Sequence, residues 1–346
     1  DITKGIHYLT LASENNLSNA QYLLGKIYIQ GEKTSRNLNK GLQLLYSAAE
    51  QNNSYAQFYL GTLYYEGKFI NYDIEKSLRY FTLAADNNNS NAQYYLGYIY
   101  YYNIIFKDYK KAINYFTLAA NQNDTNAQYE LGKIYYEGKI VPKNINKAFS
   151  FLLLSANQNN QYAQYQLGLI YHEGDNTIQD INKAIHFYTL SANNNNQYAQ
   201  YKLGHIFNEG IYVNRDTNKA IYYYTLSANQ NNFESQSELG FLYSTDEYTK
   251  KNITSTIFYL TQAAERGSEL ANYNLGVIYA MGEYINRDIK KANHYFSLAS
   301  NSNDPKILFY IGIYYYNGLY IPRDINKAIH YFKLAANQND VRAQFN

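Results

Sequence analysis

Four polar residues could support acid–base chemistry or hold a metal ion. His172 and Glu173 are adjacent, and His205 and Glu209 lie in the next segment of similar sequence. Imidazole nitrogens and carboxylate oxygens are common zinc ligands, and the same groups act as general acids and bases. They are also ordinary residues on a polar binding surface, and we favour that interpretation. The sequence therefore predicts no catalytic residue, no metal site and no bound cofactor.

The other histidines are spread along the chain rather than gathered at one place. Each follows a Lys-Ala or Lys-Gly pair by two residues, which indicates one exposed helical position in separate segments. They are His7, His186, His294 and His330. The sequence has no cysteine, which excludes thiol catalysis and Cys-ligated zinc. No Gly-x-Gly-x-x-Gly phosphate-binding motif follows a strand pattern.

Charge and hydropathy narrow the range of partners. The formal net charge is only +2, which provides no field to attract nucleic acid or an acidic membrane surface. No apolar run approaches the roughly 20 residues that a membrane-spanning helix needs. We therefore expect no nucleic-acid partner and no direct membrane insertion.

A Leu-Gly or Ile-Gly pair recurs along the whole chain. The spacing is 36 residues at every step but one, where it is 35. A fixed period of this length predicts an array of repeats rather than a globular enzyme with a single active site. The glycines of these pairs are Gly25, Gly61, Gly97, Gly132, Gly168, Gly204, Gly240, Gly276 and Gly312.

Each repeat is predicted to contain two helices. Around Gly132, Ala127 and Leu131 follow helical spacing, and Gly138 stands where that helix should end in a left-handed conformation. Asn144 is then positioned to cap the second helix through its side chain. Asp or Asn fills this position in every copy: Asp1, Asn37, Asp73, Asp108, Asn144, Asp180, Asp216, Asn252, Asp288 and Asp324.

A second recurrent position is expected to end the second helix. Asn and Gly adopt the left-handed conformation more readily than other residues. The asparagine-rich stretches are therefore interpreted as helix ends, not as disordered tracts. The position holds Asn16, Asn52, Asn88, Asn123, Asn159, Asn195, Asn231, Gly267, Asn303 and Asn339. Short antiparallel helices bury their apolar faces only when copies stack, so we predict an all-α solenoid of about nine to ten 36-residue helix-turn-helix repeats.

The unit resembles the SEL-one-like repeat (SLR), a relative of the tetratricopeptide repeat. One copy carries the pattern at Ala56, Leu60, Gly61, Tyr64, Gly67, Asp73, Lys76 and Ala84-Ala85. The resemblance covers essentially the entire chain and implies a right-handed superhelix. We expect one SLR solenoid over residues 1–346, truncated at both ends, with helix pairs incomplete at 1–16 and 341–346.

Two copies depart from the pattern. The copy around Gly97 is one residue short and has Asn103 in place of the loop glycine. The copy around Gly240 is the most degenerate, with Asp246 in place of that glycine and Ser255-Thr256 in place of Lys-Ala. Either departure is expected to change the superhelical pitch locally.

One side of the predicted first helices is unusually aromatic. By analogy with tetratricopeptide solenoids, this side should line a concave groove. Aromatic residues at one shared register are expected to wedge between repeats; the alternative is a tyrosine-lined groove for a peptide or helix. The candidate partner-binding residues are Tyr65, Tyr94, Tyr98, Tyr101, Tyr102, Tyr129, Tyr136, Tyr165, His172, Glu173, Tyr201, His205 and Glu209.

These features predict a non-enzymatic scaffold or adaptor that binds proteins or peptides along the groove. Resemblance to SLR proteins leaves one alternative, a regulatory arm of an enzyme complex, such as a ubiquitin ligase of ER-associated degradation or an activator of a polysaccharide synthase. The tyrosine-lined groove leaves another, a glycan-binding solenoid, because aromatic rings stack on sugars. Uncapped ends also favour end-to-end self-association. The compartment is not fixed by the sequence, and we favour the cytoplasm slightly over a secretory lumen.

Overall fold

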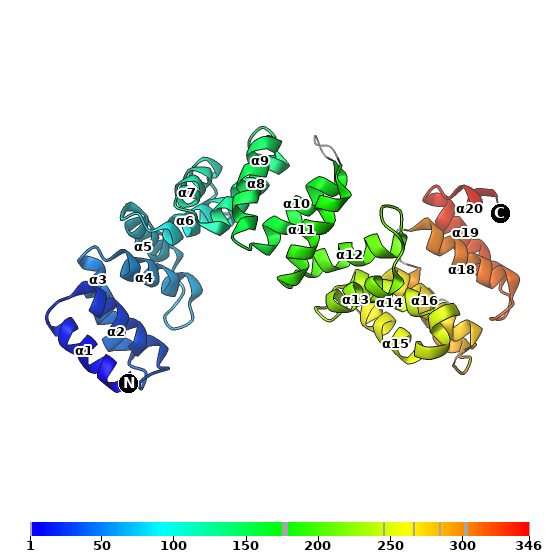
Figure 1. The fold of residues 1–346 in the computed structure, drawn as a ribbon. Coiled ribbons are helices and arrows are strands. Elements are labelled where there is room, and N and C mark those ends of the chain that lie inside the picture. Colours follow the sequence, from blue (N-terminus) through cyan, green and yellow to red (C-terminus); the bar gives the residue numbers. More distant parts are fainter. Residues whose placement is uncertain are drawn as a thin grey trace. The chain divides into compact units, whose positions relative to one another are not determined.

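The computed structural model describes residues 2–174, 179–244, 246–265, 267–283, 285–300 and 304–345. All regular structure in these residues is helical, which confirms the predicted all-α repeat architecture. The helices alternate between two kinds along the chain (Figure 1). We call those that contain the recurrent glycine first helices, and those that follow them second helices.

Most helices of both kinds span 13 residues. The first helices are α2 (Ser18–Gln30), α4 (Ser54–Glu66), α6 (Ser90–Tyr102), α8 (Thr125–Glu137), α10 (Gln161–Glu173), α12 (Gln197–Glu209), α14 (Phe233–Ser244), α16 (Glu269–Met281) and α18 (Pro305–Asn317). The second helices are α1 (Ile2–Glu14), α3 (Leu38–Glu50), α5 (Ile74–Asp86), α7 (Tyr109–Asn121), α9 (Ile145–Asn157), α11 (Ile181–Asn193), α13 (Thr217–Ala228), α15 (Asp246–Glu265), α17 (Ile289–Ala299) and α19 (Ile325–Asn337). The short α20 (Val341–Phe345) follows α19.

The chain divides into two compact units, unit 1 at residues 1–167 and unit 2 at residues 168–346. Inside each unit, a first helix packs against the second helix of its own repeat and against the second helix before it. Leucine, isoleucine and alanine side chains fill the space between the helices and are fully buried. A single solenoid over the whole chain remains a prediction.

The predicted N-caps of the second helices are confirmed wherever the structure describes them, with one exception. In α5, the Asp73 carboxylate accepts a hydrogen bond of 2.9 Å from the backbone N–H of Lys76, which satisfies an otherwise unpaired helix donor. Asp1 lies outside the described residues. Asn252 was wrongly predicted, because this copy lacks the loop glycine and α15 already begins at Asp246. Position 252 therefore lies inside a helix. The confirmed caps are Asn37, Asp73, Asp108, Asn144, Asp180, Asp216, Asp288 and Asp324.

The asparagines predicted to end the second helices adopt the left-handed conformation. Asn123 has a φ of 63°, and Gly267, which fills the same position in the degenerate copy, has a φ of 88°. The asparagine-rich stretches are thus ordered helix ends. Asn303 lies outside the described residues, and the confirmed asparagines are Asn16, Asn52, Asn88, Asn123, Asn159, Asn195, Asn231 and Asn339.

The short copy closes its loop differently from the others. Its first helix, α6, ends at Tyr102, and the following Asn103 has a φ of −78°, which is not left-handed. Instead, the Asn103 side-chain oxygen accepts hydrogen bonds from the backbone N–H groups of Ile105 and Phe106, at 2.9 and 3.3 Å. A side-chain turn therefore replaces the glycine turn, which explains how this loop functions with one residue fewer.

The recurrent glycine of each first helix lies directly against a side chain of the following second helix. A Cβ atom on Gly97 would stand 2.6 Å from Cδ1 of the Phe116 ring, and one on Gly61 would stand 2.5 Å from the same atom of Phe81. No Cβ tolerates such a distance, so the two helices can approach this closely only with glycine at this position. This packing contact therefore explains why glycine recurs at a fixed period in the sequence.

We predict that Gly97→Ala destabilises the protein by about 1–3 kcal/mol, because the added methyl group displaces the buried Phe116 ring. Gly5→Ala is the control: in helix α1 no atom lies within 4 Å of the added Cβ. Alanine's greater helix propensity should make that variant up to about 1 kcal/mol more stable. Urea denaturation of both variants measures the difference. Equal effects would contradict the close-packing argument.

We also predict that Asn123→Ala lowers the free energy of unfolding by about 1 kcal/mol, because alanine resists the left-handed conformation. Asn123→Gly should leave it nearly unchanged, since glycine adopts this conformation without a steric penalty. Thermal denaturation compares the two. A glycine variant as unstable as the alanine variant would assign the effect to a lost side-chain contact instead.

Candidate functional site

The first helices form the more closely spaced side of each unit. In unit 1, α6 lies against α8, and in unit 2, α12, α14, α16 and α18 follow one another in the same way. The described second helices of neighbouring repeats make weaker contacts or none. We call the accessible surface of the first helices the first-helix face.

A buried glutamine below this face fixes the helices of neighbouring repeats. The Gln93 amide donates to the backbone carbonyl of Ala85 at 3.3 Å, and its side-chain oxygen accepts from the Gln122 amide at 2.8 Å. Burial of an amide is stable when its polar atoms are hydrogen-bonded in this way. Sequence analysis missed this residue, although glutamine follows the small residue of the first helix, alanine or in one copy Ser235, in most copies: Gln21, Gln57, Gln93, Gln128, Gln164, Gln200 and Gln236.

The shared-register tyrosines of unit 1 pack between helices. The Tyr94 ring lies 6.0 Å from the Phe116 ring and 6.2 Å from the Tyr98 ring, between centroids. The Tyr65 ring contacts the Phe81 and Tyr95 rings at 6.3 and 5.9 Å. Burial raises the pKa of Tyr65 and of Tyr94 above the usual tyrosine value. Of these contacts, only that between Tyr65 and Tyr95 joins two repeats, so wedging by the shared-register aromatics stays a prediction.

The last two turns of α6 carry a dense group of tyrosines. The Tyr102 ring centroid lies 4.6 Å from both the Tyr98 and the Tyr101 centroid, and Tyr102 is 40% exposed. The Tyr102 hydroxyl donates a hydrogen bond of 2.8 Å to Oε2 of Glu130 on α8. The ammonium group of Lys133 lies 5.5 Å from the Tyr102 centroid and donates to its hydroxyl at 3.1 Å. The structure thus brings the three predicted tyrosines together with a carboxylate and an ammonium group.

We call this group the tyrosine–glutamate site; it consists of Tyr94, Tyr98, Tyr101, Tyr102, Tyr129, Glu130 and Lys133. Glu130 is only 7% exposed. Burial raises the pKa of its carboxyl group, and the Tyr102 hydrogen bond and the Lys133 charge oppose that rise in part. In return, the Glu130 charge adds to burial in raising the pKa of four of the tyrosines, that of Tyr129 to about 12.

Sequence analysis also missed Glu130. It stands two residues before the recurrent glycine, at a position that varies between copies more than its neighbours do: Leu23, Tyr59, Tyr95, Glu130, Gln166, Lys202, Glu238, Asn274 and Tyr310. This variation could have pointed to Glu130, because positions that differ between repeats are not constrained by the packing that all repeats share. Glu238 in unit 2 resembles Glu130 in that burial raises its pKa.

Tyr129 of this site makes a further ring contact, and two more predicted residues of unit 1, Tyr136 and Tyr165, lie on first helices. The Tyr129 ring contacts the Tyr162 ring at 5.9 Å, and the Lys143 ammonium lies 5.0 Å from the Tyr136 centroid. Tyr165 is half-buried on α10. All three therefore belong to the first-helix face or its edge.

In unit 2, the predicted histidines and glutamates do not converge on one point. Nδ1 of His172 lies 3.3 Å from the Tyr188 hydroxyl, and its ring contacts that of Tyr212. Burial lowers the pKa of His172, with a smaller contribution from Lys202. His205 instead pairs with Glu209, whose Oε2 lies 3.3 Å from Nδ1.

The remaining predicted residues of unit 2 also differ in their surroundings. The Tyr201 ring lies 6.0 Å from that of His205 and 5.9 Å from that of Tyr224, whereas Glu173 is exposed. No group of three or more metal-ligating side chains occurs among the residues that the structure describes. The arrangement corresponds to a polar and aromatic surface.

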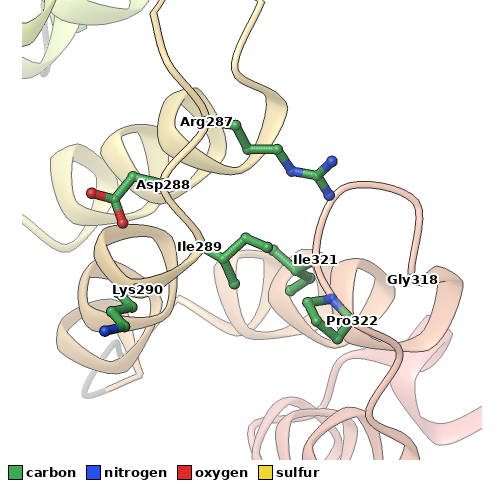
Figure 2. Close-up of a pocket in the computed structure, with 7 residues that line it drawn as sticks. All are labelled: Arg287, Asp288, Ile289, Lys290, Gly318, Ile321 and Pro322. Atoms are coloured by element: carbon green, nitrogen blue, oxygen red, sulfur yellow. The ribbon is translucent and has the colours of Figure 1, made fainter.

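A pocket outside the first-helix face lies at the loops that precede α17 and follow α18 (Figure 2). The Arg287 side chain extends toward the loop of Gly318, and its guanidinium donates to the backbone carbonyl of Tyr320. Ile289 faces Ile321 across the pocket. The arginine is engaged with backbone, and Asp288 caps α17 by accepting a hydrogen bond from the backbone N–H of Lys291. We therefore interpret this pocket as a structural contact between two repeats.

The sequence profile of the Sel1 repeat matches the chain ten times and covers nearly all of it, at residues 1–17, 18–53, 54–89, 90–124, 125–160, 161–196, 197–232, 233–268, 270–304 and 307–340. The chain belongs to the Sel1 repeat family. Sel1 repeat proteins generally serve as non-catalytic scaffolds that bind other proteins. The predicted family is thereby confirmed.

Solved Sel1 repeat structures agree with this assignment. The protein c5321 of uropathogenic Escherichia coli, a protective antigen with an SLR fold, shares 25% sequence identity with a TM-score of 0.81. The match covers 99% of this chain and 75% of that protein. A Sel1 repeat protein from Oxalobacter formigenes shares 22% identity over 99% of this chain and 90% of its own, with a TM-score of 0.51. No curated protein sequence matched the chain.

Within the part of the chain that the structure describes, no helix is both long enough and apolar enough to cross a membrane.

The burial of Glu130 predicts a pH-dependent stability. The folded chain holds the Glu130 proton more tightly than the unfolded chain does, so the free energy of unfolding falls as pH rises from the ordinary value of 4.5 through the raised pKa. Glu130→Gln should therefore become progressively more stable relative to the wild type as the pH rises from 4.5 through the raised pKa. Parallel stability curves for wild type and Glu130→Gln would contradict the prediction.

Proposed function

We propose that this protein is a non-enzymatic scaffold that binds partner proteins or peptides along the first-helix face. The observation that carries the proposal is the group of Tyr98, Tyr101 and Tyr102 at the end of α6, in which the Tyr102 ring contacts the other two and all three are partly exposed. Tyrosine is enriched at binding hot spots because it offers a large contact area and a hydrogen-bonding hydroxyl.

The support beneath this face favours binding without large rearrangement. The Gln93 hydrogen bonds and the contact of Gly97 with Phe116 hold α6 against its neighbours. Rings whose positions are fixed before binding lose less conformational entropy when a partner arrives. A surface of this kind can retain a partner through few residues.

The polar groups of the face also favour a scaffold over an enzyme. His205 pairs with Glu209, and His172 contacts the hydroxyl of Tyr188. A catalytic site needs a nucleophile, a base and an orienting group that converge on one substrate position. Here the histidines engage separate partners within the fold.

The experiment compares the wild type with Tyr98→Ala/Tyr101→Ala/Tyr102→Ala in affinity capture from lysate of the source cells, followed by quantitative mass spectrometry. Partners of the face should fall by about tenfold or more, as expected when clustered hot-spot residues are removed. The matched control is Tyr8→Ala/Tyr222→Ala, which removes exposed tyrosines from second helices.

Circular dichroism and thermal denaturation establish that each variant folds. A set of partners that the folded triple variant retains, and that the control variant loses, would move the binding surface to the second helices. A sugar array serves the glycan alternative: binding to sugars without any protein partner would replace the scaffold proposal.

A further inference from the structure

The tyrosine–glutamate site places a buried carboxylate next to aromatic rings without giving it an ionic partner. Glu130 is 7% exposed, and its Oε2 accepts a hydrogen bond from the Tyr102 hydroxyl. No ion pair joins it to any residue in the described part of the chain. An ionised carboxylate at this depth is costly unless a cation or further hydrogen bonds compensate it.

The other acids near the site are already engaged. Glu137 forms an ion pair of 3.1 Å with Lys139. Asp124 caps α8 by accepting a hydrogen bond of 2.8 Å from the backbone N–H of Ala127. Of these three acidic residues, Glu130 is therefore the one whose carboxylate can accept a cation from a partner.

Lys133 shows that a cation fits against these rings. Its ammonium lies 5.5 Å from the Tyr102 centroid and donates to the Tyr102 hydroxyl rather than to Glu130. A cation over a tyrosine face is attracted by the electron-rich ring. Lys133 thus occupies the aromatic part of the site and leaves the carboxylate unpaired.

We propose that this site binds the guanidinium group of an arginine side chain in a partner protein or peptide, a specificity that rests on the scaffold function proposed above. A guanidinium stacks on tyrosine rings and donates hydrogen bonds to a carboxylate at the same time, which an ammonium does less well. The arginine takes the place of Lys133 beside Tyr102 and pairs with Glu130. The partner segment therefore contains an accessible arginine.

The test begins with selection from a random dodecapeptide library displayed on phage, with the full chain as target. The tightest peptide is synthesised with arginine and with citrulline, its neutral isostere, and its affinity is measured by fluorescence anisotropy. We expect the citrulline peptide to bind at least about tenfold more weakly, because Glu130 then loses its cation. Glu130→Gln should weaken binding of the arginine peptide similarly, and citrulline should cause little further loss in that variant.

Two variants serve as comparisons. Glu50→Gln removes the same charge from the exposed end of α3 and should bind as the wild type does. Lys133→Gln should bind the arginine peptide more tightly, since it frees the Tyr102 ring for the guanidinium. Circular dichroism of each variant excludes loss of folding as the cause of any change.

The outcomes separate this inference from the scaffold proposal. Peptides that need Tyr98, Tyr101 and Tyr102 but not arginine or Glu130 would overturn the inference and leave the scaffold standing. Peptides for which lysine replaces arginine without loss would overturn the assignment to a guanidinium. Peptides indifferent to the tyrosines as well, or the failure to select any peptide, would count against both proposals.

Discussion

The close approach of two helices at a single glycine is the contact on which every repeat depends. At Gly97, the first helix comes so near to the Phe116 ring that a methyl group has no room, and the same arrangement recurs from copy to copy. The ring in turn packs against alanines and leucines that are fully buried. The hydrogen bond from the Gln93 amide to the Ala85 carbonyl then joins this pair to the preceding one. Because these contacts are buried, residues on the surface of a repeat can vary without disturbing them.

The fold was largely predictable because each of its determinants is a residue type with one conformational or steric role. Gly97 is required by a close contact between helices, and Asn123 adopts the left-handed conformation that ends a helix. Such roles repeat with the period and are therefore visible in one sequence. The wrong N-cap at Asn252 arose where the copy had lost its loop glycine, so that the helix extended toward the N-terminus.

The candidate site was predictable only in part. Tyr98, Tyr101 and Tyr102 could be placed on one side of a helix by spacing alone, and the structure groups them. Their link to Glu130 depends on which first helices lie side by side, and helical periodicity within one repeat contains no such information. For the same reason, the hydrogen bond between His172 and Tyr188 was not foreseen, although both residues follow recurrent registers.

The glutamine contacts have a consequence for how the length of such a chain can change. Gln93 donates a hydrogen bond to the Ala85 carbonyl of the preceding repeat, just as Gln57 donates to the Ala49 carbonyl and Gln128 to the Ala120 carbonyl. Each of these junctions presents the next repeat with an equivalent backbone carbonyl. Unequal recombination that duplicates or deletes a whole copy would recreate a junction of the same kind. The array can therefore gain or lose repeats in evolution without inventing a new interface, while each copy keeps its own surface residues.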